Sequence, residues 1–201
     1  VVAIYRSYAS IARSWLVTIL QSVFVAQVAV VAVSALKRMG LYQEMYGFTT
    51  LRLYVEWFIY FTLILLVLAV AALIARFSFR RFAGAVLVLG ALAGVIVSWV
   101  NVDAVIAKEN IMRWQQDEKK GLDVEYLSEL SLDAVPAIGE LLKTNREALT
   151  PGQALLLKSY WEAKQNQVAS TTPLSYSWSV MQAKLTFAEV NSQLGNYFTD
   201  I

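Results

Sequence analysis

The chain has 201 residues, of which 58% are hydrophobic, and its mean hydropathy of +0.52 is too high for an ordinary soluble domain. It contains no Cys and no His, which excludes disulfides, thiol chemistry, the usual zinc sites, His-ligated haem and His general-base catalysis within this chain. The net charge of +2 averages a basic half (residues 1–100, eight Lys/Arg and two acids) and an acidic half (residues 101–201, nine Lys/Arg and thirteen acids). This division predicts a membrane protein with a soluble tail and not a nucleic-acid-binding protein.

Residues 1–15 are too short to span a bilayer, and their apolar residues recur at helical spacing. They predict either an interfacial amphipathic helix or the end of a truncated span. The chain begins with Val1 and not with Met, so we expect an incomplete or processed start with further spans before it. The residues on the expected apolar face are Ile4, Tyr8, Ile11 and Trp15.

Residues 16–100 predict a three-span transmembrane region. The apolar stretches 16–36, 53–75 and 82–100 are each long enough to cross a hydrocarbon core of about 30 Å as a helix, in which every backbone amide is satisfied internally. A tight basic turn over residues 76–81 makes the second and third spans an antiparallel hairpin. The third span meets no helix breaker, so we expect one continuous helix from Phe82 to Arg113 that carries the tail.

The connector over residues 39–52 is expected to lie in the membrane interface, after Lys37 and Arg38 have closed the first span. Gly40 and Gly47 are predicted turn or cap positions. Thr49 or Thr50 can cap the helix that follows.

Three polar residues in or beside the spans are candidate sites. Gln27 lies mid-span and should face another helix, where its amide makes an interhelical hydrogen bond. Glu56 is the one acid of the second span and is expected to pair with Arg52, one turn earlier. Asp103 follows the third span, on the same side of the membrane as Glu56. The simpler interpretation is that each acid pairs with a basic side chain or caps local backbone. The alternative is that the two acids share a cation or proton site.

Gly90, Gly94 and Ser98 place a row of small side chains on one face of the third span. Such a row lets another helix approach closely. We therefore predict a helix-packing face whose partner is a span of this chain or of another protein.

Residues 101–201 predict one small helical domain. A short helix is expected around residues 122–130, and Asp133 is expected to cap the next one, with Pro136 in its first turn. Thr150 and Gln153 form a capping box around Pro151. The last helix is expected over residues 178–198, with an apolar face made by Val180, Phe187, Val190, Leu194 and Phe198.

The basic residues that flank the spans predict the topology. One side holds five of them and the opposite side three, so we expect the turn over residues 76–81 in the cytoplasm and the C-terminal domain outside. The five are Arg6, Arg13, Arg76, Arg80 and Arg81, and the three are Lys37, Arg38 and Arg52.

Three motifs carry a resemblance to a known family. They are YGFT-x-LR (residues 46–52), N-x-DA-x-IA-x-x-N (101–110) and YLSELS-x-DAVPAI (126–138). Together they resemble a bacterial family of multi-pass membrane proteins of unknown function, in which a variable set of spans ends in a hairpin and a C-terminal helical domain. The resemblance covers residues 37–140 well, and Ser177 and Trp178 resemble a motif that opens the family's last helix. Val102 and Ser179 depart from it, standing where Pro and Asn are usual.

The resemblance implies a longer parent chain in the bacterial cytoplasmic (inner) membrane. The family has no established reaction, so it implies no catalytic residue. The sequence itself has no phosphate-binding glycine loop, no nucleotide fingerprint and, without His, no Ser-His-Asp arrangement. We therefore expect no enzyme, no cofactor and no metal site.

The fold class is thus all-α: a transmembrane helical hairpin plus one further span, followed by a small soluble helical domain. The function we expect is that of a non-catalytic accessory or scaffold subunit, with the lipid bilayer and other membrane protein subunits as partners. The alternatives are a component of a transporter or channel, lined by Gln27, Glu56 and Asp103, and a ligand sensor. A concave apolar pocket with convergent polar groups in the tail would favour the sensor.

Overall fold

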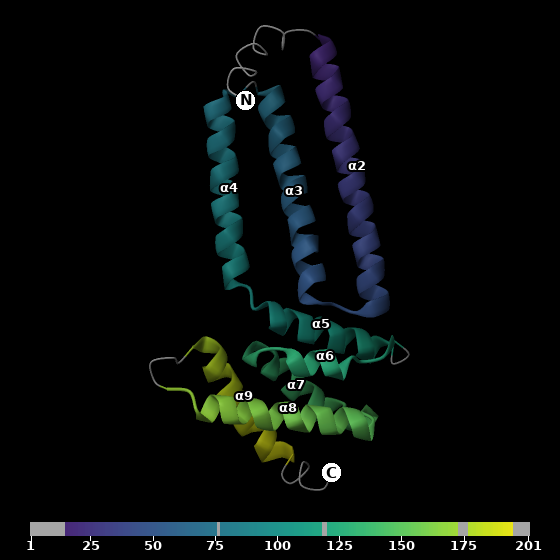
Figure 1. Cartoon of the computed structure of the whole chain (residues 1–201), viewed down its shortest axis with the longest axis vertical. Helices are drawn as coiled ribbons and strands as arrows, with labels where there is room; N and C mark the ends of the chain where they lie inside the picture. The colour runs from purple at the N-terminus through teal and green to yellow at the C-terminus, as the bar shows by residue number, and fades with distance from the viewer. Residues whose placement is uncertain (1–14, 76, 118–119, 173–176, 195–201) are drawn as a thin grey trace. The chain divides into compact units, whose positions relative to one another are not determined.

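The computed structural model describes residues 15–75, 77–117, 120–172 and 177–194, which form helices without any strand (Figure 1). The predicted all-α fold class is confirmed, and the helix expected over residues 1–15 lies almost wholly outside the described residues. The helices are α2 (Trp15–Tyr46), α3 (Thr50–Ile74), α4 (Phe79–Trp99), α5 (Val102–Gln116), α6 (Val124–Glu129), α7 (Val135–Thr144), α8 (Pro151–Ala169) and α9 (Trp178–Leu194), with the 3₁₀ turns η2 (Leu132–Ala134) and η3 (Arg146–Ala148).

The chain divides into two compact units. The transmembrane unit comprises Val1–Tyr42 and Tyr54–Trp99, and the C-terminal unit comprises Gln43–Leu53 and Val100–Ile201. The connector between α2 and α3 therefore belongs to the C-terminal unit, a grouping that the sequence did not indicate.

Three helices of the transmembrane unit are long and apolar enough to cross a membrane: Ile19–Tyr46, Thr50–Ile74 and Phe79–Trp99. Their large apolar side chains point outward, with Leu20, Val67 and Leu87 between 68% and 74% exposed. Such surfaces are unstable in water and stable in hydrocarbon, so the chain is a membrane protein, as predicted. α3 and α4 run in opposite directions around a short turn (Figure 1). This turn is shorter than expected, because α4 already begins at Phe79 and includes Arg80 and Arg81.

The helix of the first span does not end with that span at Leu36. α2 continues through Lys37, Arg38 and Gly40 to Tyr46. Lys and Arg are good helix formers, and a single glycine inside a helix costs only about 1 kcal/mol, so neither stops the helix. The end comes at Gly47, whose φ of +79° is the left-handed conformation that closes helices. The cap predicted at Gly47 is thus confirmed, and the one at Gly40 is wrong.

The continuous helix predicted from Phe82 to Arg113 is also wrong. α4 ends at Trp99, and α5 starts anew at Val102. Asn101 is the N-cap of α5, with φ −76° and ψ 88°, and its carbonyl accepts the first helical bond from Val105 N at 3.1 Å. The side chain of Asn101 makes no cap hydrogen bond, so the non-helical backbone at this residue breaks the helix, without a Pro or Gly.

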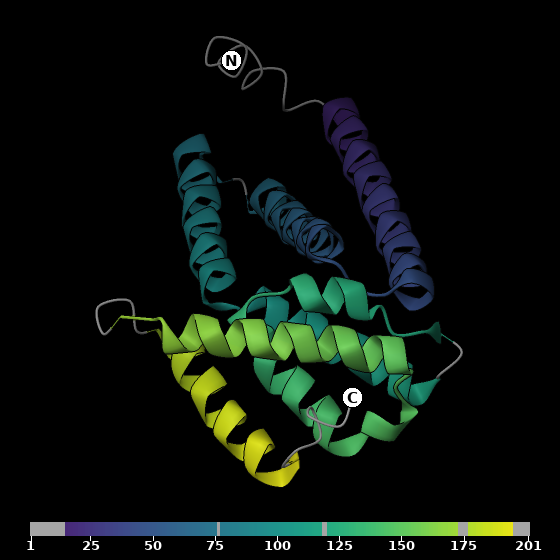
Figure 2. The same ribbon diagram turned by 60° about the horizontal axis from the view of Figure 1, so that its bottom comes forward.

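The core of the C-terminal unit forms around α7, which packs against α5, η2 and α9, while α8 packs against α6 and α9 (Figure 2). Gly139 on α7 permits the close approach of α9, because a Cβ there would lie 2.6 Å from Thr186 Cγ2. Trp161 on α8 is almost fully buried and meets Phe187 of α9 edge to face at 4.6 Å between centroids. Val180 and Val190 of the predicted apolar face of α9 are buried as well, whereas residue 198 lies outside the described residues.

The predicted capping box is confirmed, because Thr150 Oγ1 accepts from Gln153 N and Gln153 Oε1 accepts from Thr150 N. Pro136 lies in the first turn of α7, as predicted. The cap expected at Asp133 is wrong, because Ala134 is the N-cap of α7 and no side chain caps it. The intervening η2 turn displaces Asp133 from that position.

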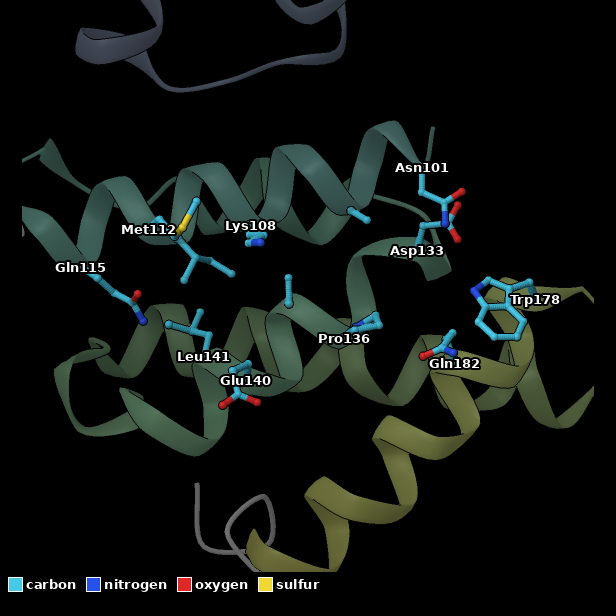
Figure 3. A pocket seen from close by; sticks show the side chains of 13 residues that line it. Asn101, Lys108, Met112, Gln115, Asp133, Pro136, Glu140, Leu141, Trp178 and Gln182 are labelled. Atoms are coloured by element: carbon cyan, nitrogen blue, oxygen red, sulfur yellow. The ribbon is translucent and has the colours of Figure 1, made fainter. Parts of the chain in front are cut away.

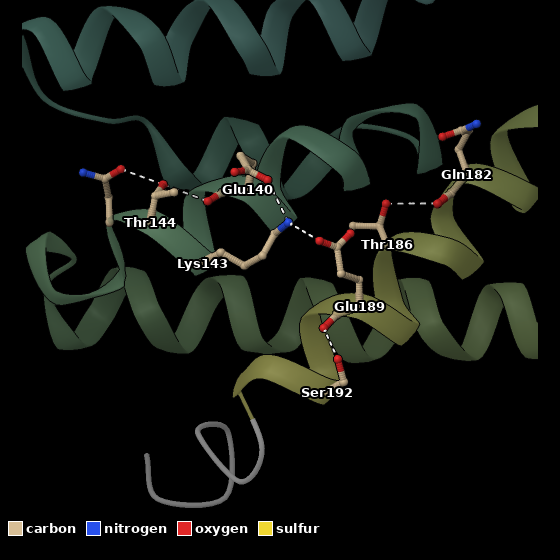
Figure 4. A network of polar contacts seen from close by, with 8 residues as sticks. Glu140, Lys143, Thr144, Gln182, Thr186, Glu189 and Ser192 are labelled. Atoms are coloured by element: carbon tan, nitrogen blue, oxygen red, sulfur yellow. Dashed lines mark hydrogen bonds and ion pairs between the residues drawn. The ribbon is translucent and has the colours of Figure 1, made fainter.

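A polar network also joins α7 to α9 on the surface (Figure 4). Lys143 Nζ donates to Glu140 Oε2 at 2.8 Å and to Glu189 Oε1 at 2.9 Å. The hydrogen bonds to Glu140 and Glu189 raise the pKa of Lys143. The network fixes the two helices beside the close contact at Gly139.

Candidate functional site

The connector of residues 43–53 is bound by side chains of α5 and α6 and by Lys120, and we call these contacts the connector clamp. At its centre, Asn110 Oδ1 accepts from Phe48 N at 2.7 Å and Asn110 Nδ2 donates to Phe48 O at 2.9 Å. Asn110 is only 7% exposed. One amide thus satisfies both polar groups of a backbone unit that follows the end of α2.

Glycine at position 47 is required by both the backbone and the space. Its φ is positive, and a Cβ would lie 2.6 Å from Asn110 Oδ1 and 3.2 Å from Arg113 Nη2. The connector therefore approaches α5 as closely as a residue without a side chain allows.

Three further side chains extend the clamp, one toward the start of α3 and two toward the last turn of α2. Tyr126 of α6 accepts from Thr50 N at 3.0 Å and bonds Thr50 Oγ1 at 3.1 Å, at the first residue of α3. Arg113 Nη1 donates to Glu44 O at 3.1 Å, and Lys120 Nζ forms an ion pair with Glu44 at 3.4 Å. Arg113 Nε is buried without a partner among the described residues.

Arg52 stabilises the connector from within. Its Nη1 donates to Gly47 O at 2.7 Å and to Tyr46 O at 3.3 Å, and its guanidinium lies over the Tyr46 ring. Thr49 Oγ1 accepts from Arg52 N at 3.4 Å, which confirms the predicted cap of α3. The ion pair expected between Arg52 and Glu56 stays a prediction.

Asp103, one of the candidate sites, binds backbone. Its Oδ2 accepts from Ser131 N at 3.0 Å, and Tyr160 Oη donates to Ser131 O at 3.1 Å. Burial raises the pKa of the Tyr160 hydroxyl, and the carboxylates of Asp103 and Asp133 raise it further, so this hydroxyl stays a neutral donor. This contact joins Asp103 to a residue 28 positions later and fixes the turn before η2, so it is not the local backbone cap considered for Asp103.

The other candidate residues lie on the transmembrane unit. Gly90 and Gly94 would each accept a Cβ without meeting an atom within 4 Å, and Ser98 Oγ donates to Gly94 O at 2.8 Å within α4. Gln27 is exposed on α2, so the described part of this chain does not cover it. Glu56 is half-buried on α3. Among the described residues, no group of three acidic side chains could hold a metal ion.

The C-terminal unit contains a cavity of about 470 Å³, within the range of small-molecule sites, that sequence reasoning missed (Figure 3). α5 and α7 supply its apolar walls, and Trp178 and Gln182 of α9 close one end. Its lining residues come from three separate segments of the chain, 101–115, 133–141 and 178–182, so no local motif signals it. Asp133, Lys108 and Glu140 are the charged residues of its lining.

No curated protein and no solved structure matches the chain. A family described as "Domain of unknown function (DUF4153)" matches residues 1–141. The matched segment contains all three membrane helices and every side chain of the connector clamp, and it ends within α7. The chain, a membrane protein, therefore belongs to the DUF4153 family, whose description assigns it no activity.

Proposed function

We propose that this chain is a non-catalytic scaffold subunit of a larger membrane assembly, in which the C-terminal unit is a rigid platform. The observation that carries this proposal is the connector clamp. The chain enters or leaves the C-terminal unit at three places, after Tyr42, Leu53 and Trp99, so each membrane helix is covalently joined to it. A domain on a single flexible tether would need no such clamp.

The partner in this proposal is another integral membrane protein, docked along α4. The α4 face of Gly90, Gly94 and Ser98 is exposed, and no described residue lies within 4 Å of the Cβ positions of its two glycines. Small residues in register let two helices approach closely enough for dispersion and interhelical contacts to hold them in lipid. The proposed location is the bacterial cytoplasmic membrane with the C-terminal unit outside, from the five-to-three distribution of basic residues.

Crosslinking and co-purification from native membranes in mild detergent test this proposal. Gly90→Leu and Gly94→Leu place a large side chain on the docking face and should each abolish recovery of the partner. Gly84→Leu is the matched control, because Gly84 also lies exposed on α4 with open space at its Cβ position. At 100° per residue it stands about 120° from Gly90 and about 80° from Gly94. Recovery that survives both docking-face variants, or is lost equally in the control, contradicts the proposal.

A second candidate function, ligand sensing, is favoured by the cavity of the C-terminal unit. The cavity lies against α5, whose Asn110 and Arg113 bind the connector. A ligand that shifts α5 would therefore act on the segment that joins α2 to α3. Hydrogen exchange of the connector amides, measured with and without a bound ligand, tests this coupling.

A further inference from the structure

The carboxylate of Asp133 lies at one end of the cavity in the C-terminal unit, and its oxygen Oδ1 has no hydrogen-bond partner among the described residues. Asp133 belongs to η2, and its backbone N donates to Ser131 Oγ at 3.4 Å, which holds the turn. Its Oδ1 is buried, and no described residue donates to it. Burial removes the water that would otherwise solvate this oxygen, and no described protein group replaces that water as a donor.

The other charges of the lining do not compensate Asp133. Glu140 carries the same sign and is paired with Lys143 at 2.8 Å. Lys108 is exposed on α5 and makes no ion pair among the described residues. Because Lys143 neutralises Glu140, Asp133 is the unpaired charge at its own end of the cavity, beside Trp178, and this end favours a positively charged group.

The chemistry of the walls differs from that of this end. The apolar residues of the lining are Ala104, Ile111 and Met112 of α5 and Pro136, Ala137 and Leu141 of α7. Figure 3 shows Trp178 at the same end as Asp133 and Gln115 at the opposite end. An occupant that fills the cavity thus has an apolar body and one charged end.

We propose that this cavity binds an organic amine with an apolar body, whose ammonium group lies at Asp133 and Trp178. A carboxylate gives an ammonium a charge-assisted hydrogen bond, and the face of an indole attracts a cation through its quadrupole. A neutral or anionic ligand of the same shape leaves Asp133 uncompensated. This inference deepens the ligand-sensing candidate and is independent of the scaffold role.

The test uses three probes that share one apolar body: 4-phenylbutylamine, 4-phenylbutanol and 4-phenylbutyrate. Each is titrated calorimetrically into the full chain in lipid nanodiscs, and the heat of empty nanodiscs is subtracted. The amine should bind at least about tenfold more tightly than the alcohol or the acid, a difference of about 1.4 kcal/mol. Equal affinity of alcohol and amine, or no saturable binding of the amine, overturns the proposal.

Variants locate the site. Asp133→Asn keeps the shape and removes the charge, and it should weaken amine binding about tenfold while leaving alcohol binding unchanged. Glu129→Gln is the control, because it removes the same charge from an exposed position on α6. An equal loss in both variants shows general electrostatic attraction and overturns the assigned site.

A second variant keeps the test decisive if Asp133→Asn does not fold. Trp178 is 64% exposed at the first residue of α9, so Trp178→Leu spares the core and retains apolar area while removing the aromatic face. Amine affinity should fall several-fold with no change for the alcohol. Unchanged amine affinity overturns the proposal, and neither result alters the co-purification test of the scaffold role.

Discussion

Asn110 of α5 hydrogen-bonds both backbone polar groups of Phe48, 62 positions earlier in the chain. The two bonds, of 2.7 and 2.9 Å, run in opposite directions, as those of a neighbouring strand would. A surface loop would make these hydrogen bonds with water, whereas the connector makes them with a side chain of the C-terminal unit. This pair makes the connector part of that unit's fold.

Asn110→Ala should lower the free energy of unfolding by about 1–3 kcal/mol, because the partly buried N–H and C=O of Phe48 lose their partner. Asn110→Asp should also destabilise, since it retains an acceptor for Phe48 N but loses the donor to Phe48 O. Denaturant unfolding of the full chain in detergent micelles measures both. Asn166→Ala, on the exposed side of α8, should stay within about 0.5 kcal/mol of the original, and an equal effect there contradicts the role of Asn110.

Gly47→Ala should destabilise more than Gly121→Ala, although both glycines have a positive φ, +79° and +66°. Both substitutions add the left-handed strain of about 1–2 kcal/mol. Only at position 47 does the new Cβ also meet Asn110 Oδ1, at 2.6 Å, whereas Gly121 has open space. Unfolding of the two variants measures the difference. In an Asn110→Ala background the extra loss at position 47 should shrink, and its persistence there would place the clash elsewhere.

The features that the sequence predicted depend on short-range chemistry. The capping box at Thr150 and Gln153 and the cap at Thr49 join residues three positions apart, so spacing alone indicates them. The three spans follow from length and hydropathy. By contrast, the bonds between Phe48 and Asn110, and between Thr50 and Tyr126, depend on tertiary folding that no local pattern encodes.

The two wrong helix boundaries have related causes. Lys37, Arg38 and Gly40 were interpreted as the end of a span, but a helix leaving lipid does not have to stop where charged residues begin. Conversely, residues 100 and 101 interrupt a helix with no Pro or Gly, because Asn101 takes a cap conformation. The cavity was missed for a third reason: its acid, Asp133, was interpreted as a helix cap, which the η2 turn prevents.

Gly40→Ala should stabilise the chain by about 0.5–1 kcal/mol, because Gly40 lies inside α2 and nothing meets its Cβ position within 4 Å. The thermal midpoint of the full chain in nanodiscs measures this effect. The same substitution at Gly47, seven positions later, should lower the midpoint. A loss of stability at Gly40 would indicate that the chain turns there and that α2 ends earlier.

Gly139→Ala should destabilise the C-terminal unit by about 1–3 kcal/mol, because α7 and α9 touch at this position. The added Cβ would lie 2.6 Å from Thr186 Cγ2 and 3.1 Å from Val190 Cγ2, and both atoms belong to a helix that Trp161 and the Lys143 ion pairs hold in place. Denaturant unfolding measures the loss.

Thr186→Ser supplies the rescue for this variant, because it removes the methyl group nearest the new Cβ and keeps the hydroxyl that donates to Gln182 O at 3.0 Å. The double variant should therefore recover part of the stability that Gly139→Ala loses. Gly152→Ala, where the Cβ meets nothing within 4 Å, should be neutral or slightly stabilising. If position 139 tolerates alanine as well as position 152 does, α9 does not pack against α7 at this glycine. The end of the cavity that Trp178 and Gln182 of α9 close would then lack the support of that packing.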